Sequence, residues 1–390
     1  MSHTETIELG SIGRIVTGKT PSSAIDGAFG GDVPFITPSD MDGRKWIETT
    51  ERYLTSAGVN AVKNSVLPKN SIAVSCIGSD MGKVVMVARN SVSNQQINSI
   101  IVDEERYAPE YIYYLLLPRQ KELKDLASGS ATPILSKGLF SKVTADVVPL
   151  PTQLAIVEIL SSLDEKIELN RKQNRTLEAI AQALFKHWFV DFEFPDENGR
   201  AYKSSGGTMQ PSELGEIPVD WQTGRLDDVI VLQRGFDLPQ TKRTPGPYPV
   251  LAASGKNGSH DEFKVKGPGV TTGRSGVIGR VFYVHEDFWP LNTSLWVKEF
   301  KKAKPAYAYF LLMSLDFEGF NAGSAVPTLN RNHVHSLDMV IPSMELIDKF
   351  EEMASSLLAR QKCNTEQIDT LSALRDTLLP KLMSGEIRVA

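Results

Sequence analysis

The chain has 390 residues, 41% of them hydrophobic and 23% charged, which is too long for one ordinary domain and typical of a soluble globular protein with two or three. The net charge of −5 argues against a protein that binds nucleic acid over its whole surface, although it leaves room for a basic face. With only two distant cysteines, Cys76 and Cys363, no signal peptide and no run of the ~18 apolar residues that span a membrane, we expect a cytoplasmic protein without a membrane partner.

The first 150 residues predict a β-rich domain. Short β-branched runs such as "SIAVSC" and "KVVMVA" alternate with Gly, Pro, Asn and Ser, which is typical of strands and turns. One helix is expected from Pro109 to about Leu126, with acidic and basic residues at the ends that the helix dipole favours.

A long helix is predicted over residues 151–192. Apolar and amide residues recur at alternating spacings of four and three, which is the pattern of a coiled-coil seam. The seam positions are Ile156, Leu160, Leu163, Ile167, Asn170, Asn174, Leu177, Ala181, Leu184 and Trp188. At ~1.5 Å per residue, some 35 residues give a helix about 50 Å long.

The rest of the chain repeats this organisation. Residues 193–217, rich in Gly, Ser and charge, are expected to form a flexible linker, followed by a second β-rich domain at 218–342. A second long helix is predicted at 343–383, before a tail at 384–390. Its seam positions are Leu346, Phe350, Met353, Leu357, Arg360, Asn364, Gln367, Leu371, Leu374 and Leu378.

Both seams are polar in the middle, where a purely stabilising zipper has Leu. Such buried polar groups cost stability but fix the register of paired helices. We therefore expect the two helices to pair antiparallel with their polar centres together; ordinary amphipathic packing is the alternative. The residues expected to set the register are Asn170, Asn174, Arg360, Asn364 and Gln367.

Five stretches of the first half recur in the second half in the same order, displaced by between 192 and 197 residues. "YAPEYIYYLLL" at 107–117 matches "AKPAYAYFLLM" at 303–313, and "SGSATPIL" at 128–135 matches "AGSAVPTL" at 322–329. The period is too long for a solenoid, so it indicates a duplicated domain and a bipartite target. The fold class expected is α+β, with two β-rich domains in a pseudo-two-fold arrangement separated by two long antiparallel coiled-coil helices.

Motifs of catalysis are weak or lacking. "GSDMGKV" at 78–84 departs from the phosphate-loop pattern, and "GRSGVIG" at 273–279 does not open a helix after a strand. The six histidines form no metal-binding pair, and His333 and His335 are expected on a strand edge in a structural role. No nuclease or amino-methyltransferase motif occurs. The sequence therefore favours a protein that recognises a target, without a cofactor or metal, over an enzyme.

Basic and amide residues of both domains predict DNA contacts, because Arg reads guanine, Asn and Gln read adenine, and Lys, Ser and Thr hold phosphates. Residues 234–280 hold eight basic and three acidic residues, a balance of +5. Solvated polar loops, and a structural turn for the repeated "GSA" loops, are the alternatives. The candidates in the first domain are Arg14, Lys19, Thr20, Ser39, Arg44, Lys83, Gln95, Gln96, Ser130, Thr132 and Lys137. Those in the second are Arg234, Lys242, Arg243, Lys256, Asn257, Arg274, Arg280, Ser324, Asn330 and Arg331.

Taken together, the repeated "GSA" loops, the helix from "QLAIVEIL" to "ALFKHWFVDFEFP" (153–195) and the stretch "NGRAYKSSGG…LGEIPVDWQ" resemble the specificity subunit of type I restriction–modification enzymes over essentially the whole chain. The lead into each helix, "PLPTQLAIVEIL" and "IPSMELIDKF", is shorter than is usual in that family. The resemblance implies two target-recognition domains, at 1–150 and 218–342, that each read half of a split asymmetric site in double-stranded DNA.

The resemblance also implies partners. Helical regions that set the spacer would dock two methyltransferase (modification) subunits, and restriction/translocase subunits would join further out. Methyl donor and ATP would bind those partners, so the chain itself would be non-catalytic and hold no cofactor. The apolar "ALFKHWF" end of the first helix is expected to be an exposed docking site. A protein-binding scaffold with duplicated domains and no DNA specificity is the alternative, and a nuclease or methyltransferase with an unrecognised site is a third hypothesis.

Overall fold

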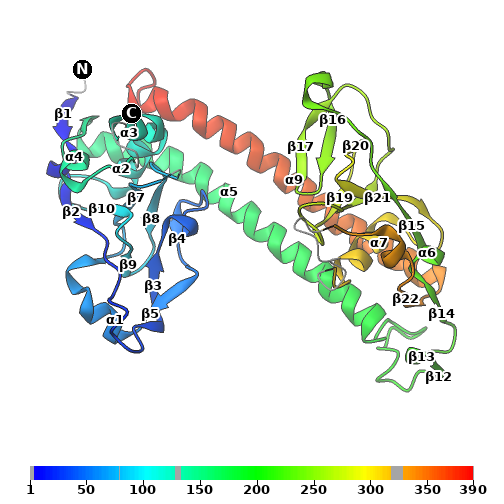
Figure 1. Ribbon diagram of the computed structural model, residues 1–390. Coiled ribbons are helices and arrows are strands. Elements are labelled where there is room, and N and C mark those ends of the chain that lie inside the picture. Colours follow the sequence, from blue (N-terminus) through cyan, green and yellow to red (C-terminus); the bar gives the residue numbers. More distant parts are fainter. Residues whose placement is uncertain (1–3, 79, 128–132, 318–327, 390) are drawn as a thin grey trace. The chain divides into compact units, whose positions relative to one another are not determined.

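The computed structural model describes residues 4–78, 80–127, 133–317 and 328–389. Its contacts divide the chain into two units: unit 1 is Met1–Asn170 with Gln367–Ala390, and unit 2 is Arg171–Glu366. Each unit combines a β-rich domain with one part of each long helix, α5 (Leu150–Phe185) and α9 (Met344–Met383), which are green and red in Figure 1. Unit 1 is therefore built from both ends of the chain.

The sheets of unit 1 have the strand orders β1-β11, β2-β10-β7-β8-β4 and β5-β3-β9-β6. The strands are β1 (Glu5–Glu8), β2 (Gly13–Thr17), β3 (Phe29–Ile36), β4 (Trp46–Ile47), β5 (Arg52–Leu54), β6 (Val66–Leu67), β7 (Ile72–Ser75), β8 (Val84–Val87), β9 (Ser91–Ser93), β10 (Ile97–Val102) and β11 (Thr144–Val147). The helices beside α5 and α9 are α1 (Ser56–Ala61), α2 (Pro109–Leu116), α3 (Gln120–Leu126) and α4 (Lys137–Ser141).

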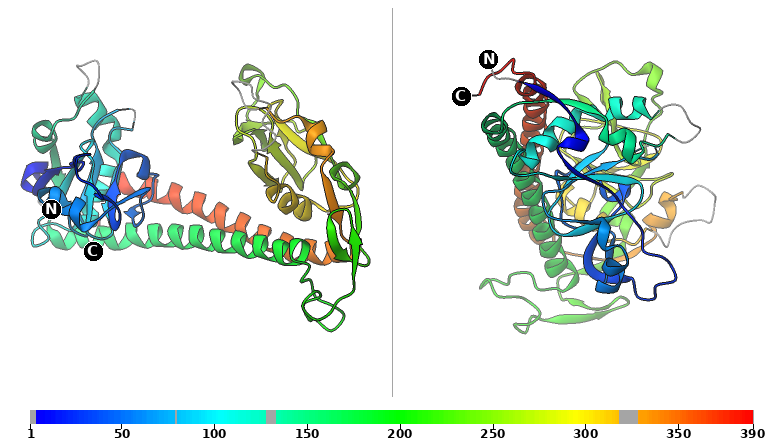
Figure 2. Two further views of the ribbon diagram at one scale, coloured as in Figure 1. Left: turned by 60° about the horizontal axis from the view of Figure 1, so that its bottom comes forward. Right: turned by 90° about the vertical axis from the view of Figure 1, so that its left-hand side faces the viewer.

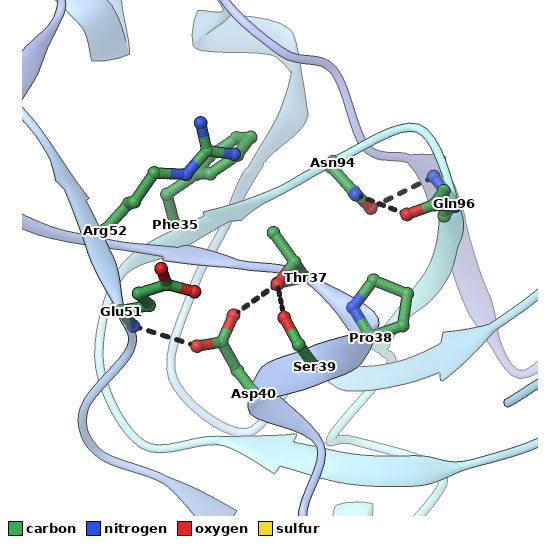
Figure 3. A pocket seen from close by; sticks show the side chains of 9 residues that line it. All are labelled: Phe35, Thr37, Pro38, Ser39, Asp40, Glu51, Arg52, Asn94 and Gln96. Atoms are coloured by element: carbon green, nitrogen blue, oxygen red, sulfur yellow. Dashed lines mark hydrogen bonds between the residues drawn. The ribbon is translucent and has the colours of Figure 1, made fainter. Parts of the chain in front are cut away.

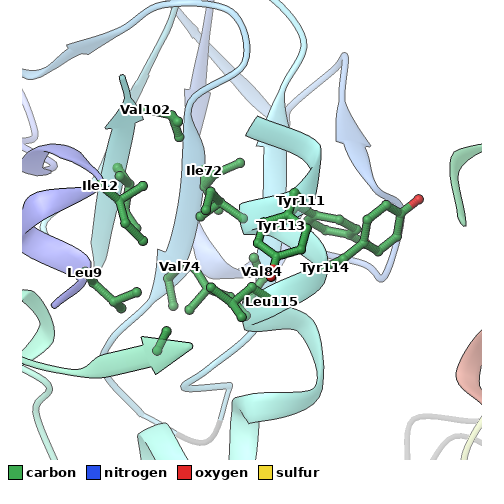
Figure 4. Packing of buried hydrophobic residues seen from close by; sticks show 14 of the residues in the cluster. Leu9, Ile12, Ile72, Val74, Val84, Val102, Tyr111, Tyr113, Tyr114 and Leu115 are labelled. Carbon is green, nitrogen blue, oxygen red and sulfur yellow. The ribbon is translucent and has the colours of Figure 1, made fainter. Parts of the chain in front are cut away.

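The main core of unit 1 lies between α2 and the sheet that contains β7 and β8 (Figure 4). Pro109 begins α2, where its missing N–H costs no hydrogen bond and its fixed φ suits the helix. The buried tyrosines Tyr111 and Tyr114 extend from this helix, while Ile72 and Val74 come from β7. Each fully buried side chain of this size contributes ~1.5–3 kcal/mol, so the helix is held by its packing.

Unit 2 repeats this topology. The strand orders are β14-β22, β15-β21-β18-β19, β17-β16-β20 and, in addition, the hairpin β12-β13. The strands are β12 (Met209–Ser212), β13 (Gly215–Pro218), β14 (Gln222–Arg225), β15 (Ile230–Arg234), β16 (Tyr248–Ala252), β17 (Gly255–His260), β18 (Gly269–Gly273), β19 (Val281–Val284), β20 (Trp289–Pro290), β21 (Ser294–Phe300) and β22 (Asp338–Ile341). The helices beside the long ones are α6 (Leu226–Val229), α7 (Pro305–Met313) and α8 (Arg331–His335).

The predicted duplication is confirmed by the strand pairing. The orders β15-β21-β18-β19 and β17-β16-β20 correspond to β2-β10-β7-β8 and β5-β3-β9, and the parallel pair of β3 with β9 returns as β16 with β20. The repeated sequence stretches fall on matching elements, namely α2 with α7, β10 with β21 and β8 with β19. One supersecondary plan is therefore used twice, with different side chains at its loops.

Within each unit α5 and α9 run antiparallel, because residue numbers rise along one helix as those of its contacts fall along the other. The contacting pairs are Asp164 with Arg375 and Asn170 with Gln367 in unit 1, and Asn174 with Asn364 and Phe185 with Phe350 in unit 2. Both helices are continuous through the polar centre (Figure 2). All ten predicted seam positions between Ile156 and Trp188 are buried or half-buried.

The second predicted seam is displaced by one residue over much of its length. Met353, Arg360, Gln367 and Leu374 are exposed, whereas Ala354 and Gln361 are buried or half-buried. A straight α-helix has 3.6 residues per turn, so a strict 3.5-residue seam drifts by ~20° per heptad. The alternating pattern therefore matched α9 at some turns and missed it at others.

Four local expectations were wrong. Pro118 lies in a 3₁₀ turn (Leu117–Arg119) that divides the helix expected at 109–126, since proline does not fit a helix interior. The supposed flexible linker is folded: it contains the β12-β13 hairpin, and Phe194 stacks on Tyr202. Phe185, Trp188 and Phe189 of the "ALFKHWF" segment are buried in the core of unit 2 and do not form an exposed surface. His333 and His335 lie in the short helix α8, although His335 does act structurally by accepting a hydrogen bond from the Leu232 N–H.

Candidate nucleic-acid interface

In unit 1 several loops meet at the segment Asn94–Gln96, which leads into β10 and which we call the β10 junction. The loop that follows β2 reaches it through the Lys19 N–H, which donates to the Ser93 carbonyl oxygen at 2.8 Å. The Thr20 hydroxyl donates to Oε1 of Gln95 at 2.8 Å. On the other side the Cys76 N–H, directly after β7, donates to the Gln96 carbonyl oxygen at 2.7 Å.

Unit 2 has the same arrangement at Leu291–Thr293, which leads into β21 and which we call the β21 junction. The Phe236 N–H donates to the Pro290 carbonyl oxygen at 2.8 Å, and the Arg274 N–H donates to the Thr293 carbonyl oxygen at 2.9 Å. Nδ2 of Asn292 donates to Oδ1 of Asp237. The pair Asp237 and Asn292 thus occupies the position of Thr20 and Gln95.

A glycine stands at the same place beside each junction. A Cβ on Gly18 would lie 2.1 Å from the Asn94 carbonyl oxygen, and one on Gly235 would lie 2.3 Å from that of Leu291. Real Cβ atoms do not approach backbone oxygen so closely, so both positions require glycine. The scaffold of the two junctions is therefore the same, while the side chains on it differ.

The repeated "GSA" loops end at these junctions. The Leu135 N–H donates to the Cys76 carbonyl oxygen at 3.0 Å, and the Leu329 N–H donates to that of Arg274 at 2.8 Å. Ser130, Thr132 and Ser324 lie outside the described residues. The described end of each loop is hydrogen-bonded to the residue that follows β7 or β18, beside the junction. The repeated sequence therefore corresponds to a repeated attachment of the loop.

Beside the β10 junction an open hollow of about 540 Å³ lies at the ends of β3 and β9 (Figure 3). Its lining residues are Phe35, Thr37, Pro38, Ser39, Asp40, Glu51, Arg52, Asn94 and Gln96. The Asp40 carboxylate has a structural role, because it accepts hydrogen bonds from the Thr37 N–H and hydroxyl and from the Glu51 N–H. The Arg52 guanidinium lies 4.8 and 5.0 Å from the ring centres of Phe29 and Phe35.

The two amides of the hollow are bonded to each other. Nδ2 of Asn94 donates to Oε1 of Gln96 at 2.9 Å, and the Gln96 N–H donates to Oδ1 of Asn94 at 3.0 Å. Asn94 is buried and shapes the loop, while Gln96 is half-exposed. Polar side chains that are held in this way can bind a base edge without first losing conformational freedom.

The structure brings some predicted residues of unit 1 together and separates others. Lys19, Thr20, Gln95 and Gln96 meet at the junction, and Ser39 lines the hollow. Arg14 lies toward the other end of β2. Lys137 begins α4, two residues after Leu135.

Two of the predicted cations in unit 1 have acidic partners. Arg44 pairs with Asp42 at 2.9 Å and Lys83 with Asp80 at 3.0 Å. Although partial burial acts to raise the pKa of Asp42, the hydrogen bonds from Arg44 outweigh it and lower that pKa. These cations are therefore weaker candidates for phosphate binding than Lys19, which is exposed.

In unit 2 the predicted residues lie at the β21 junction, on the β16-β17 hairpin and at separate exposed positions. Arg274 lies at the β21 junction, where it also donates to the Asn292 carbonyl oxygen at 3.4 Å. Arg243 donates to Oδ1 of Asn257 at 2.8 Å and to the Leu238 carbonyl oxygen, so this arginine braces the β16-β17 hairpin. Among the predicted residues of unit 2, the exposed cations are Arg234 on β15, Lys242 beside Arg243, Lys256 on the hairpin, Arg280 before β19 and Arg331 on α8. Asn330 caps α8 by accepting from the Asn332 N–H at 3.0 Å.

Sequence reasoning missed Arg52, Asn94, Asp237 and Asn292. Asn94 directly precedes the selected Gln95 and Gln96 but was not selected, and Asn292 begins "NTSLWVKE" (292–299), one of the five repeated stretches. The sequence repeat sets Asn292 against Ile97, so the equivalence of Gln95 and Asn292 becomes apparent only from the strand pairing and backbone hydrogen bonds of β10 and β21. The acid Asp237 was counted only as charge, although it orients an amide.

A buried polar network also joins the elements of unit 1. Nζ of Lys45 donates to Oε1 of Glu110 at 2.6 Å and to Oγ of Ser161 at 2.9 Å, while the Tyr114 hydroxyl donates to Oδ2 of Asp164 at 2.6 Å. Burial, reinforced by Asp164, raises the pKa of Tyr114. The network fixes the β-rich domain to α5, so it positions the junction without belonging to it.

The polar centre of the helices has further amide contacts. In unit 1, Nδ2 of Asn170 donates to Oε1 of Gln367 at 3.2 Å. In unit 2, Nδ2 of Asn364 donates to Oδ1 of Asn174 at 2.9 Å, and Arg360 is exposed. Among the described residues no cluster of His, Cys, Asp and Glu is arranged to hold a metal ion. Of the helices described, none is both long and apolar enough to cross a membrane.

Comparison with known proteins gives a consistent result. The family model of the type I restriction modification DNA specificity domain matches residues 1–179 and 218–373. The type I restriction enzyme MjaIX specificity subunit of Methanocaldococcus jannaschii is 28% identical over 414 residues, which cover 97% of this chain and 92% of the relative. The HindI specificity subunit of Haemophilus influenzae is 38% identical over 180 residues, 45% of this chain and 39% of the relative. The S subunit of a type I restriction–modification system from M. genitalium has the same fold, with a TM-score of 0.64 at 16% identity over 98% of this chain and 96% of that one.

Proposed function

Because the chain belongs to the type I restriction modification DNA specificity family, we propose that it reads a split, asymmetric site in double-stranded DNA, with one half-site for each recognition domain. The observation that carries this proposal is the pair of junctions, β10 in unit 1 and β21 in unit 2. They share one backbone scaffold but hold different amide and charged side chains. A duplicated scaffold with different reading groups suits two half-sites of different sequence.

We assign the two recognition domains to residues 1–150 and 218–342 and the spacer to the long helices. α5 has 36 residues and continues unbroken from unit 1 into unit 2, and α9 returns with 40. At ~1.5 Å per residue α5 is about 54 Å long, which exceeds the ~34–36 Å between half-sites one helical turn apart. The amide contacts of Asn170 and Asn174 would hold the register of the two helices, so the number of unread bases would be fixed.

Catalysis is assigned to partner subunits. We propose that two methyltransferase subunits bind this chain and that restriction/translocase subunits join the complete complex, with methyl donor and ATP held by those partners. Exposed apolar residues on α5, among them Leu154, Leu169 and Ile180, support a protein partner on this helix. Neither Cys76 nor Cys363 is in a disulfide, which suits the cytoplasm.

An exchange of domains tests the proposal. Residues 1–150 are replaced by those of a related specificity subunit, the chain is expressed with its methyltransferase partner, and methylated sites are mapped by sequencing. We expect one half-site to change while the other half-site and the spacer stay the same. Methylation at unchanged sites, or the loss of both half-sites in a folded chain, would contradict the proposal and favour the protein-binding scaffold.

A further inference from the structure

We propose that Gln95 and Asn292 are equivalent specificity-determining residues and that their neighbours make them read opposite kinds of base edge. This inference rests on the proposed function and deepens it. Gln95 would donate to a base acceptor in one half-site, and Asn292 would accept from a base amino group in the other.

The equivalence of the two residues follows from the backbone. Ser93 accepts from the Lys19 N–H and Pro290 from the Phe236 N–H, and the two acceptors lie two residues before Gln95 and Asn292. On the other side the carbonyl oxygens of the next residues, Gln96 and Thr293, accept from the residue that follows β7 or β18. Gln95 and Asn292 therefore occupy one position of a repeated scaffold.

The partner of each amide decides which of its atoms is free for DNA. In unit 1 the Thr20 hydroxyl donates to Oε1 of Gln95, so the oxygen is held and the NH₂ group remains as a donor. In unit 2 Asp237 is a carboxylate that only accepts, so it holds Nδ2 of Asn292 and leaves Oδ1 as an acceptor. The exposed Gln95 and the half-exposed Asn292 are both accessible at the surface of their units.

In the major groove of DNA, the amide atom that remains free decides which base edge each residue can bind. An amide NH₂ donates to N7 of a purine, O6 of guanine or O4 of thymine, whereas an amide oxygen accepts only from N6 of adenine or N4 of cytosine. Gln96 strengthens the donor character of the β10 junction, because its own Oε1 is held by Asn94. We therefore assign an acceptor-bearing base to unit 1 and an amino-bearing base to unit 2.

The test exchanges the orienting neighbour and keeps the reading residue. Asp237→Asn is nearly isosteric at an exposed site and supplies a donor that the carboxylate lacks, so Asn292 can now accept from it and turn its NH₂ group outward. Asp220→Asn, the same change at an exposed residue elsewhere in unit 2, is the control. Thr20→Val removes the donor that orients Gln95, and Lys69→Ala, at the opposite end of β7 from the junction, is its control.

Each variant is expressed with the methyltransferase partner, and methylated sites are mapped in a random DNA library. Asp237→Asn is expected to raise the preference for guanine or thymine over adenine or cytosine at one position of one half-site, by roughly tenfold. Thr20→Val is expected to relax one position of the other half-site, and both controls keep the parental site. In addition, 7-deazapurine at the position read by Gln95 should weaken the parental protein where that base is a purine.

The outcomes separate the two levels of the proposal. A bipartite parental site that Asp237→Asn and Thr20→Val leave unchanged at every position, or weaken evenly, overturns the assignment of Gln95 and Asn292 but keeps the proposed function. A parental chain without a bipartite site overturns the proposed function itself. If Asp237→Asn does not fold, Asn292→Ala tests the same assignment, because it removes the outward acceptor and should relax that position of the half-site.

Discussion

The guanidinium of Arg375 on α9 donates a hydrogen bond of 2.8 Å to Oδ1 of Asp164 on α5, inside unit 1. The Asp164 side chain is only 7% exposed and accepts a second hydrogen bond from the Tyr114 hydroxyl. Arg375 has another acidic partner, the exposed Asp376, also at 2.8 Å. One arginine thus binds a buried and an exposed carboxylate, which allows their contributions to be compared directly.

Asp164→Ala should destabilise unit 1 by about 3 kcal/mol, because it leaves Tyr114 and part of Arg375 buried without an acceptor. Asp376→Ala removes only a solvent-screened pair and should cost less than ~1 kcal/mol. Urea unfolding of the full chain, followed by circular dichroism, measures both. Equal losses for the two variants would show that the buried network does not hold the helices together.

His335→Ala should reduce the pH dependence of unit 2 stability. Burial lowers the pKa of His335 below its ordinary value of 6.5, and the ring must stay neutral at Nε2 to accept from the Leu232 N–H. Because the unfolded chain then takes up the proton more readily, stability is fully present above pH 6.5 and is lost as the pH falls below it. Thermal unfolding between pH 5 and 8 measures the slope, with His333→Ala, an exposed neighbour, as the control. If the stability of His335→Ala depended on pH as steeply as that of the parental protein, the role assigned to His335 would be contradicted.

Gly18→Ala should disrupt the β10 junction, since its Cβ would lie 2.1 Å from the Asn94 carbonyl oxygen. The backbone would have to move, so we expect a loss of about 1–3 kcal/mol and a loss of methylation with the partner subunit present. Gly138→Ala in α4, where a Cβ meets nothing within 4 Å, should be neutral or slightly stabilising. Normal methylation by Gly18→Ala would mean that the close approach of Gly18 to Asn94 is dispensable.

Four residues inserted at the polar centre of both α5 and α9 should change the number of unread bases and leave both half-sites as they are. The insertion adds about one helical turn, or ~6 Å, to each helix. Mapping of methylated sites measures the spacer, and four residues inserted at Glu197 and Asn198, in the folded segment after α5, serve as the control. A change in half-site sequence with an unchanged spacer would contradict the role of the helices.

The sequence predicted what depends on periodicity and repetition. The duplicated domain, the long helices and the buried polarity at Asn170 and Asn364 all followed from residue spacing, and the structure has them. The α9 seam was partly wrong because spacing alone does not distinguish a supercoil from a straight helix; Ala354 and Gln361 carry no strong hydrophobic signal.

The candidate site was predicted less well, because its geometry depends on contacts between distant segments. Gln95 and Thr20 were selected by residue type, but their pairing across 75 positions was not visible in the sequence. Asp237 was overlooked because an acid is a poor DNA ligand; its role becomes apparent only beside Asn292. Arg243 was selected as a cation, yet its guanidinium is used by the hairpin.

The composition of unit 1 has a consequence for biosynthesis. Leu379 and Leu382, close to the C-terminus, are buried in the same core as Ile12 and Tyr111, and Val389 packs against that core. The β-rich domain of unit 1 therefore keeps an uncovered apolar surface until the distant helix α9 has been translated. A chain whose translation stopped before α9 would leave the core of unit 1 open, and such a product would be a substrate for chaperones and proteases before it could join an assembly.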